Sequence, residues 1–265
     1  IMRSLWLGLT ASLIFFSACA TDKATQEKPT SDVNTQVTKL PVDSAVRIDS
    51  LDNGLVYYIR HNEKPDNRVE LRLAVNAGSV LETDDQQGLA HLCEHMAFNG
   101  TKHFPKHELI NYLQSIGMRF GADLNAYTSF DETVYMLQLP TDSLEQMKTG
   151  FQVLEDWAHR VSYDSIEIDK ERKVVLEELR LGRGADARMR DEQFPILFKG
   201  SQYANRLPIG KKEIVANASY ETIRGFYNDW YRPDNMAVIA VGDCRPDTLE
   251  KLINTHFSRL KNPPD

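Results

Sequence analysis

Two histidines and a glutamate lie close together in the stretch HLCEHMAFNGT, residues 91–101. Residues four apart on a helix share one face, so His91 and His95 can direct both imidazole rings at one cation. Zinc favours such nitrogen ligands. Glu94 is close enough to the same face to act as a general base on a water molecule beside the cation. The pattern H-x-x-E-H therefore predicts a catalytic zinc site on a helix, although five-residue matches are frequent by chance.

A catalytic zinc site needs a third protein ligand, and the stretch IDKERKVVLEELR offers one. Glu171 and Glu178 are seven residues apart and so lie on one side of a helix, whereas Glu177 points about 100° away from Glu178. A zinc ion is a suitable partner for Glu178, and a histidine ring nitrogen is a suitable partner for Glu171, which would orient that ring from behind. A helix of this composition alone is usually a solvated charged face, so the prediction depends on both segments.

The surrounding residues predict strands and helices without a regular alternation. Asn53-Gly54 indicates a hairpin, residues 69–75 alternate as a half-buried strand does, and Asn99-Gly100 ends the helix that carries the histidines. Helices are expected over 86–98, 106–116, 143–160 and 164–181, and two more are expected after residue 184 and before Pro233. Strands are expected on both sides of a turn near 130–131 and over the stretch MAVIAVGD. This order favours an α+β fold in which helices pack on a mainly antiparallel sheet.

Residues 1–19 are expected to be a lipoprotein-type signal peptide. LWLGLTASLIFF is apolar but too short to span a bilayer comfortably, and FSAC resembles the bacterial lipobox, in which the cysteine, here Cys19, is acylated. A plain secretory signal cleaved near Ala20 is the alternative. Residues 20–44 are poor in large apolar side chains and are expected to form a flexible tether. The protein is therefore expected to be exported, as a periplasmic or outer-membrane-anchored lipoprotein of a Gram-negative bacterium.

The composition narrows the class of protein. A hydrophobic content of 42% in 265 residues is enough for a sizeable core. A net charge of -7 without a dense Lys/Arg run argues against a nucleic-acid partner. Three cysteines make no disulfide framework, and Cys93 and Cys244 are expected to be buried thiols.

Taken together, five stretches resemble the pitrilysin/insulinase family of zinc metallopeptidases, in its bacterial periplasmic, PqqL-like branch. They run in the family's order and cover nearly everything from about Leu51 onward. The stretches are GLAHLCEHMAFNGTKHFP, YLQSIGMRFGADLNAYTSFDETVYMLQLP, IDKERKVVLEELR, RLPIGKKE and FYNDWYRPDNMAVIAVGD.

This resemblance implies an inverted-zincin site with one zinc ion per chain. His91, His95 and Glu178 would be the ligands, Glu94 the base and Glu171 the supporting acid. Glu171 also remains the second candidate for the third ligand, because the spacing from His95 is longer than is usual in the family. The implied organisation is a pitrilysin-like half-domain: a zinc-binding catalytic domain over 45–200, followed over 201–265 by the truncated start of a second homologous domain.

The segment DLNAYTS resembles the family's substrate-binding edge strand. There an extended peptide adds as an extra strand, and Asn125 and Ala126 would contact its backbone. The alternative is that Asn125 simply ends a turn.

The implied function is that of a zinc-dependent metalloendopeptidase acting on peptides or unfolded proteins. Family members usually have two homologous halves, so a second half is expected from the same full-length chain or from a partner subunit. A non-catalytic pitrilysin-like scaffold or peptide-binding subunit is the alternative, and a metal-free envelope protein is a third reading. The presence of all four residues His91, Glu94, His95 and Glu178 favours the enzyme.

Overall fold

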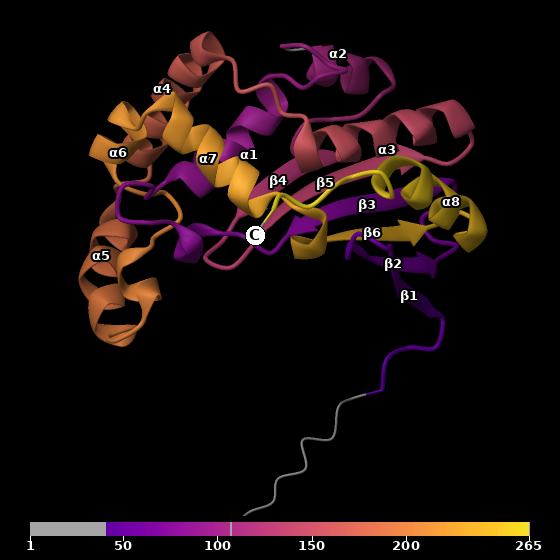
Figure 1. Ribbon diagram of the computed structural model, residues 1–265, viewed down its shortest axis with the longest axis horizontal. Coiled ribbons are helices and arrows are strands. Elements are labelled where there is room, and N and C mark those ends of the chain that lie inside the picture. The colour runs from indigo at the N-terminus through magenta and orange to yellow at the C-terminus, as the bar shows by residue number, and fades with distance from the viewer. Residues whose placement is uncertain (1–40, 107, 265) are drawn as a thin grey trace, which may run out of the picture. The chain divides into compact units, whose positions relative to one another are not determined.

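The computed structural model describes residues 41–106 and 108–264 (Figure 1). Cys19, the predicted signal peptide and most of the predicted tether lie outside the described residues. From Val42 onward the chain forms one compact unit. No helix in the part of the chain that the structure describes is long and apolar enough to cross a membrane.

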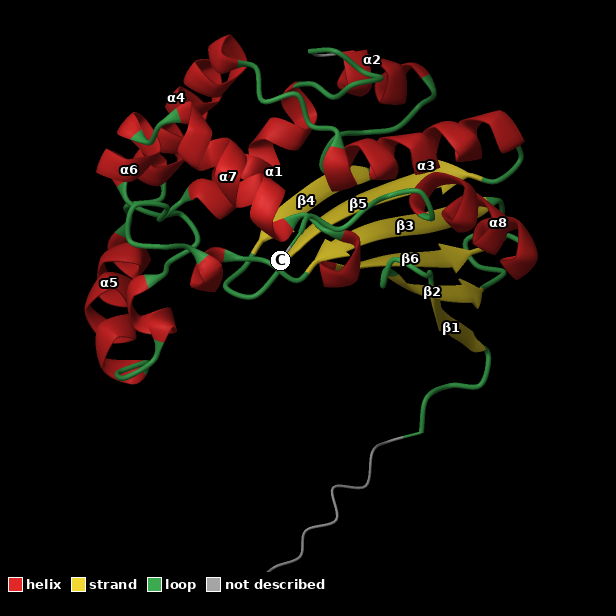
Figure 2. Cartoon of the chain, in the orientation of Figure 1, coloured by secondary structure: helices red, strands yellow, loops and turns green. Residues whose placement is uncertain are grey.

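A six-stranded sheet is the centre of this unit (Figure 2). Its strands lie in the order β1-β2-β6-β3-β5-β4, and every neighbouring pair is antiparallel except β2 and β6, which are parallel. The predicted α+β fold with a mainly antiparallel sheet is confirmed. The strands are β1 (Val46–Ser50), β2 (Val56–His61), β3 (Arg68–Val75), β4 (Leu124–Thr128), β5 (Thr133–Pro140) and β6 (Met236–Gly242).

Helices cover one face of the sheet. In β3 and β6 buried residues alternate with partly exposed ones, as expected for strands with one face in the core. Helices α1, α3 and α8 contact the strands, and α4 and α7 pack against α1. The helices are α1 (Leu89–Asn99), α2 (Glu108–Ser115), α3 (Leu144–His159), α4 (Ser165–Leu181), α5 (Ala185–Leu197), α6 (Lys212–Asn217), α7 (Tyr220–Trp230) and α8 (Pro246–Phe257).

The helix that carries the histidines begins later than predicted. Residue 88 is a glycine with φ of 102°, a left-handed conformation, so the segment before it forms a turn and α1 begins at Leu89. The start of α4 agrees with the prediction, because the Asp164 side chain accepts hydrogen bonds from the N–H groups of Ile166 and Glu167.

The last strand lies in the middle of the sheet. β6 pairs with β2 on one side and β3 on the other, so residues from the 201–265 segment share a sheet with residues from the 45–200 segment. The predicted division near residue 200 stays a prediction about the domain plan of a longer protein.

Cys93 is a buried free thiol as predicted, but Cys244 is partly exposed, since it lies just after the end of β6. The prediction of a buried Cys244 is therefore wrong.

Candidate metal centre

Helix α1 presents His91 and His95 toward the neighbouring helix α4, and Glu94 toward the strand β4. Its other side is apolar, and Leu92 and Met96 are buried in the core. The start of the helix is held by the buried Glu82, whose Oε1 accepts hydrogen bonds from backbone N–H groups of residues 88 and 90 at 3.0 and 2.9 Å. This capping and packing fix the face on which the two imidazole rings stand.

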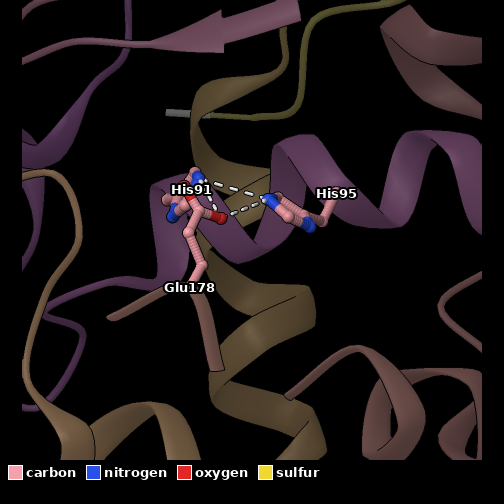
Figure 3. A group of neighbouring side chains, drawn as sticks. All are labelled: His91, His95 and Glu178. Atoms are coloured by element: carbon pink, nitrogen blue, oxygen red, sulfur yellow. Dashed lines mark hydrogen bonds and ion pairs between the residues drawn. The ribbon is translucent and has the colours of Figure 1, made fainter. Parts of the chain in front are cut away.

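The two rings meet the carboxylate of Glu178, which reaches across from α4 (Figure 3). His91 Nε2 and His95 Nε2 are 3.2 Å apart, and Glu178 Oε2 is 3.5 Å from the His95 nitrogen and 3.8 Å from the His91 nitrogen. Tetrahedral zinc with ligands at about 2.0 to 2.2 Å holds neighbouring ligand atoms about 3.3 Å apart. The observed triangle is close to that size, so these three side chains fit a zinc ion.

Glu171 lies behind His95, on the opposite side of the ring from Glu178. His95 Nδ1 donates a hydrogen bond to Glu171 Oε1 at 2.8 Å. The Asn99 side-chain amide donates to the other carboxylate oxygen at 2.6 Å and to the His95 backbone carbonyl at 3.3 Å. With its proton held on Nδ1, a neutral His95 turns the Nε2 lone pair toward His91 and Glu178, which is the orientation a metal ligand needs.

The pKa values of the two histidines are shifted in opposite directions. Burial, together with the neighbouring His95, lowers the pKa of His91 to about 4, so this ring is neutral at neutral pH. Burial also acts to lower the pKa of His95, but the hydrogen bond to Glu171 and the nearby carboxylates outweigh it and raise that pKa. His91 Nδ1 is buried without a hydrogen-bond partner among the described residues, so only His95 has its ring oriented from behind.

Glu94 lies beside the triangle with 8% of its surface exposed. Its Oε2 accepts a hydrogen bond of 2.9 Å from the hydroxyl of Thr128 on β4. Burial raises the pKa of Glu94, with Glu178 acting in the same direction, while Thr128 and His95 oppose the rise. A buried carboxylate with a raised pKa next to a cation site is suited to receive a proton.

The strand β4 is the edge of the sheet next to this site. The Gln138 N–H of β5 donates to the Asp123 carbonyl at 2.8 Å, which fixes the alternation of backbone groups along the pair. Asn125 therefore turns its backbone toward β5, while Ala126 and Thr128 turn theirs toward the free edge. The Asn125 side-chain oxygen accepts a hydrogen bond of 3.0 Å from the Ala126 N–H.

A cavity of about 360 Å³ joins the triangle to this edge strand. Ala126 and Thr128 line one side, and Pro208 and Ile209 line another. An adjoining cavity of about 340 Å³ shares Glu94, His95 and Ala126 with it. The rest of its wall is mixed: three apolar side chains and three polar ones, which are Phe98, Ile110, Phe120, Asn99, Asn125 and Glu171. The arrangement therefore has room for an extended chain beside β4, with a recess for one side chain.

Sequence reasoning missed three features of the site: Asn99, Thr128 and the wall formed by Pro208 and Ile209. Asn99 was interpreted only as part of a helix stop, and Thr128 only as part of an edge strand. Residues 207–210 carry no ligand atom type, so only the matching stretch RLPIGKKE pointed to them. Glu177, in contrast, points away from the triangle and pairs with Arg180 at 2.6 Å.

Comparisons with known proteins identify the family of this chain. Residues 57–193 match the family described as Insulinase (Peptidase family M16), and residues 217–265 match the Peptidase M16 inactive domain. A probable zinc protease PqqL of Haemophilus influenzae is 41% identical over 224 residues, which are 84% of this chain and 24% of that protein. A zinc protease PQQL-like of Arabidopsis thaliana is 44% identical over 209 residues, which are 78% of this chain and 22% of that protein.

Among solved structures, the first half of the periplasmic protease PqqL from Escherichia coli is 37% identical, with a TM-score of 0.82 over 86% of this chain and 48% of that one. The chain thus spans about a quarter of the length of the two relatives named above. The predicted family is confirmed: the fold, the H-x-x-E-H helix and the matched residues show that this chain belongs to the insulinase family of peptidases, family M16.

Proposed function

We propose that this protein is a metalloendopeptidase that holds one zinc ion through His91, His95 and Glu178. The observation that carries the proposal is the convergence of three ligand atoms from α1 and α4, all within 4.8 Å of one another, beside the buried carboxylate of Glu94. The names of the relatives as zinc proteases support it.

His91, His95 and Glu178 would hold the zinc ion, which would act as a Lewis acid toward the peptide carbonyl and the attacking water. Glu94 takes a proton from the attacking water and later delivers it to the amine that leaves. Glu171 and Asn99 keep the His95 ring in one orientation, so this ligand needs no rearrangement during the reaction.

The proposed substrates are peptides or unfolded proteins that bind in an extended conformation along β4. Ala126 offers its backbone N–H and C=O at the free edge, and main-chain pairing of this kind is insensitive to sequence. The hydrogen bond from the Ala126 N–H to the Asn125 side chain would be exchanged for one to the peptide.

The function is tested by Glu94→Gln, which keeps the shape of the side chain but cannot accept the proton. Hydrolysis of a fluorogenic peptide by the wild-type chain is expected to be abolished by a chelator and restored by zinc. The variant is expected to retain zinc by elemental analysis and to lose at least about 100-fold in kcat. Turnover by the variant at the wild-type rate would refute the role of Glu94. A wild-type chain that binds zinc but cleaves nothing would favour the scaffold alternative.

A second homologous half is proposed to complete the enzyme, either in the same longer chain or in a partner subunit. The Escherichia coli relative supports this, because the solved structure described as its first half is about twice as long as the matched region. Peptide hydrolysis per bound zinc should then be faster in a longer protein that includes the second half than in the 265-residue chain. Equal rates would contradict the proposal.

Export and lipid attachment at Cys19 are also proposed, since residues 5–19 have the pattern of a lipoprotein signal. The name of the Escherichia coli relative as a periplasmic protease supports export. In cells grown with a labelled fatty acid, the wild-type protein should carry label and Cys19→Ala should not. Equal labelling of both would contradict lipidation at this residue.

A further inference from the structure

We propose that Thr128 is a positioning residue for Glu94: its hydroxyl holds one carboxylate oxygen so that the other is presented to the reacting water. This inference rests on the proposed function, in which Glu94 is the base. It concerns a residue of the edge strand β4, not of the two helices that carry the ligands.

The contact leaves the two oxygens of Glu94 with different surroundings. Oε2 accepts the hydrogen bond from Thr128 Oγ1 at 2.9 Å. Oε1 has no hydrogen-bond partner among the described residues, and the side chain borders the cavity that also contains His91, His95 and Glu178. A hydrogen bond to a charged acceptor is among the stronger ones, so it restricts rotation of the carboxylate.

Thr128 is itself held from behind by β5. It lies directly opposite Thr133 in the strand register, and the two hydroxyl oxygens are 3.3 Å apart. Thr133 is 1% exposed and donates a hydrogen bond of 2.9 Å to the backbone carbonyl of Ala77. A β-branched side chain on a strand has few χ1 orientations, so this packing leaves the Thr128 hydroxyl pointing at Glu94.

The placement also connects the base to the edge where the peptide is proposed to bind. Thr128 is two residues after Ala126, so both side chains are on the same face of β4 and both backbones turn to the free edge. A peptide that pairs with β4 would order the strand that carries the hydroxyl. Substrate binding and the orientation of Glu94 are therefore coupled through one residue.

The test compares Thr128→Val, which removes the hydroxyl at nearly constant shape, with Thr128→Ser, which retains it. Thr128→Val is expected to lower kcat by about 10- to 100-fold, with KM within about twofold and zinc content unchanged. Thr128→Ser should recover most of the rate. Thr255→Val is a matched control, because Thr255 lies on α8, lines neither cavity of the site, and bonds through its hydroxyl to the Lys251 carbonyl of its own helix. A wild-type kcat in Thr128→Val, or loss that serine does not rescue, would overturn the inference.

A second measurement does not depend on activity and so separates this inference from the proposed function. Crystal structures of the wild type and both Thr128 variants should show one orientation of the Glu94 carboxylate in the wild type and in Thr128→Ser. In Thr128→Val the carboxylate should rotate or occupy several orientations. A single unchanged orientation in the valine variant would overturn the positioning role even if the chain proved to be an active peptidase.

Discussion

Glu178 and Glu171 are the two carboxylates of α4 that contact α1 at the candidate metal centre, and Glu178 is the more exposed of them. Its side chain is 52% exposed, whereas those of His91 and His95 are 13% and 19% exposed. Among the described residues Glu178 makes no ionic contact except with the two rings. A bound cation would therefore be its main electrostatic partner.

Replacing Glu178 should remove the metal, and its neighbour provides a matched control. Glu178→Ala is expected to reduce zinc by elemental analysis from about one per chain to well below half, because two imidazoles alone bind zinc weakly. Glu177→Ala should keep full zinc content, since Glu177 pairs with Arg180 and not with the rings. Equal zinc content in the two variants would contradict the assignment of the third ligand.

Helical periodicity made most of the site predictable at the level of residues. The spacing of His91 and His95 and that of Glu171 and Glu178 each placed two groups on one side of a helix, and the structure brings these groups together. Asn99 and Thr128 were not predictable in this way. Their contacts depend on how α1 sits against α4 and β4, which no spacing within one segment encodes.

At the scale of elements, the start of α1 is packed directly against the segment that forms a wall of the site. A Cβ at position 210 would lie 2.2 Å from the Gly88 Cα and 2.5 Å from the Gln87 carbonyl, and Gly210 has φ of 71°. The Lys211 N–H also donates to the Gln87 carbonyl at 3.2 Å. Two glycines therefore allow the backbones before α1 and α6 to touch.

We expect Gly210→Ala to destabilise the fold by at least about 2 kcal/mol, because it adds both a backbone clash and a left-handed alanine. Gly225→Ala is the control: it lies inside α7 with nothing within 4 Å of an added Cβ, so it should stabilise by about 0.5 to 1 kcal/mol. Urea unfolding measures both changes. A neutral Gly210→Ala would contradict the packing described.

The carboxyl group that caps α1 should make stability depend on pH. Burial raises the pKa of Glu82 from 4.5 to about 8. The hydrogen bonds that its carboxylate accepts from backbone N–H groups act in the opposite direction but are outweighed. Between pH 4.5 and about 8, Glu82 therefore keeps its proton in the folded protein but has released it in the unfolded chain. Stability from this group is therefore lost as pH rises from about 5 to 8, by up to about 1.4 kcal/mol per pH unit.

Glu82→Gln provides the measurement, since glutamine retains an acceptor oxygen for the N–H groups of residues 88 and 90 but does not titrate. Urea unfolding of the wild type and the variant is compared between pH 5.5 and 8. The difference in unfolding free energy should shift in favour of the variant as pH rises. A difference that stays constant over this range would rule out a raised pKa.

At the scale of the whole molecule, a zinc ion shared by α1 and α4 should stabilise the entire compact unit. A ligand at about 100 times its dissociation constant adds about 2.7 kcal/mol, which for a domain of this size corresponds to about 5 to 10 °C in Tm. Chelation should lower Tm by that amount in the wild type and leave Glu178→Ala unchanged. An equal fall in both would show that the chelator acts elsewhere.

Composition, turn residues and alternation were enough to predict an α+β molecule, but not the order of its strands. Asn53-Gly54 predicted the β1–β2 hairpin, and the turn near residue 130 predicted β4–β5, because both pairings are local. The parallel pairing of β2 with β6 joins segments far apart in the sequence. Such a contact leaves no local pattern in either strand.

The central place of β6 determines when the sheet can be completed during synthesis. β2 touches the rest of the sheet only through β6, and β3 has β6 on one side. A ribosome must therefore release nearly the whole unit before the two parts of the sheet can join, and the long-range pairing makes folding slow. We therefore expect the β1–β2 hairpin of a nascent chain to stay unjoined to β3, β5 and β4 until β6 has left the ribosome.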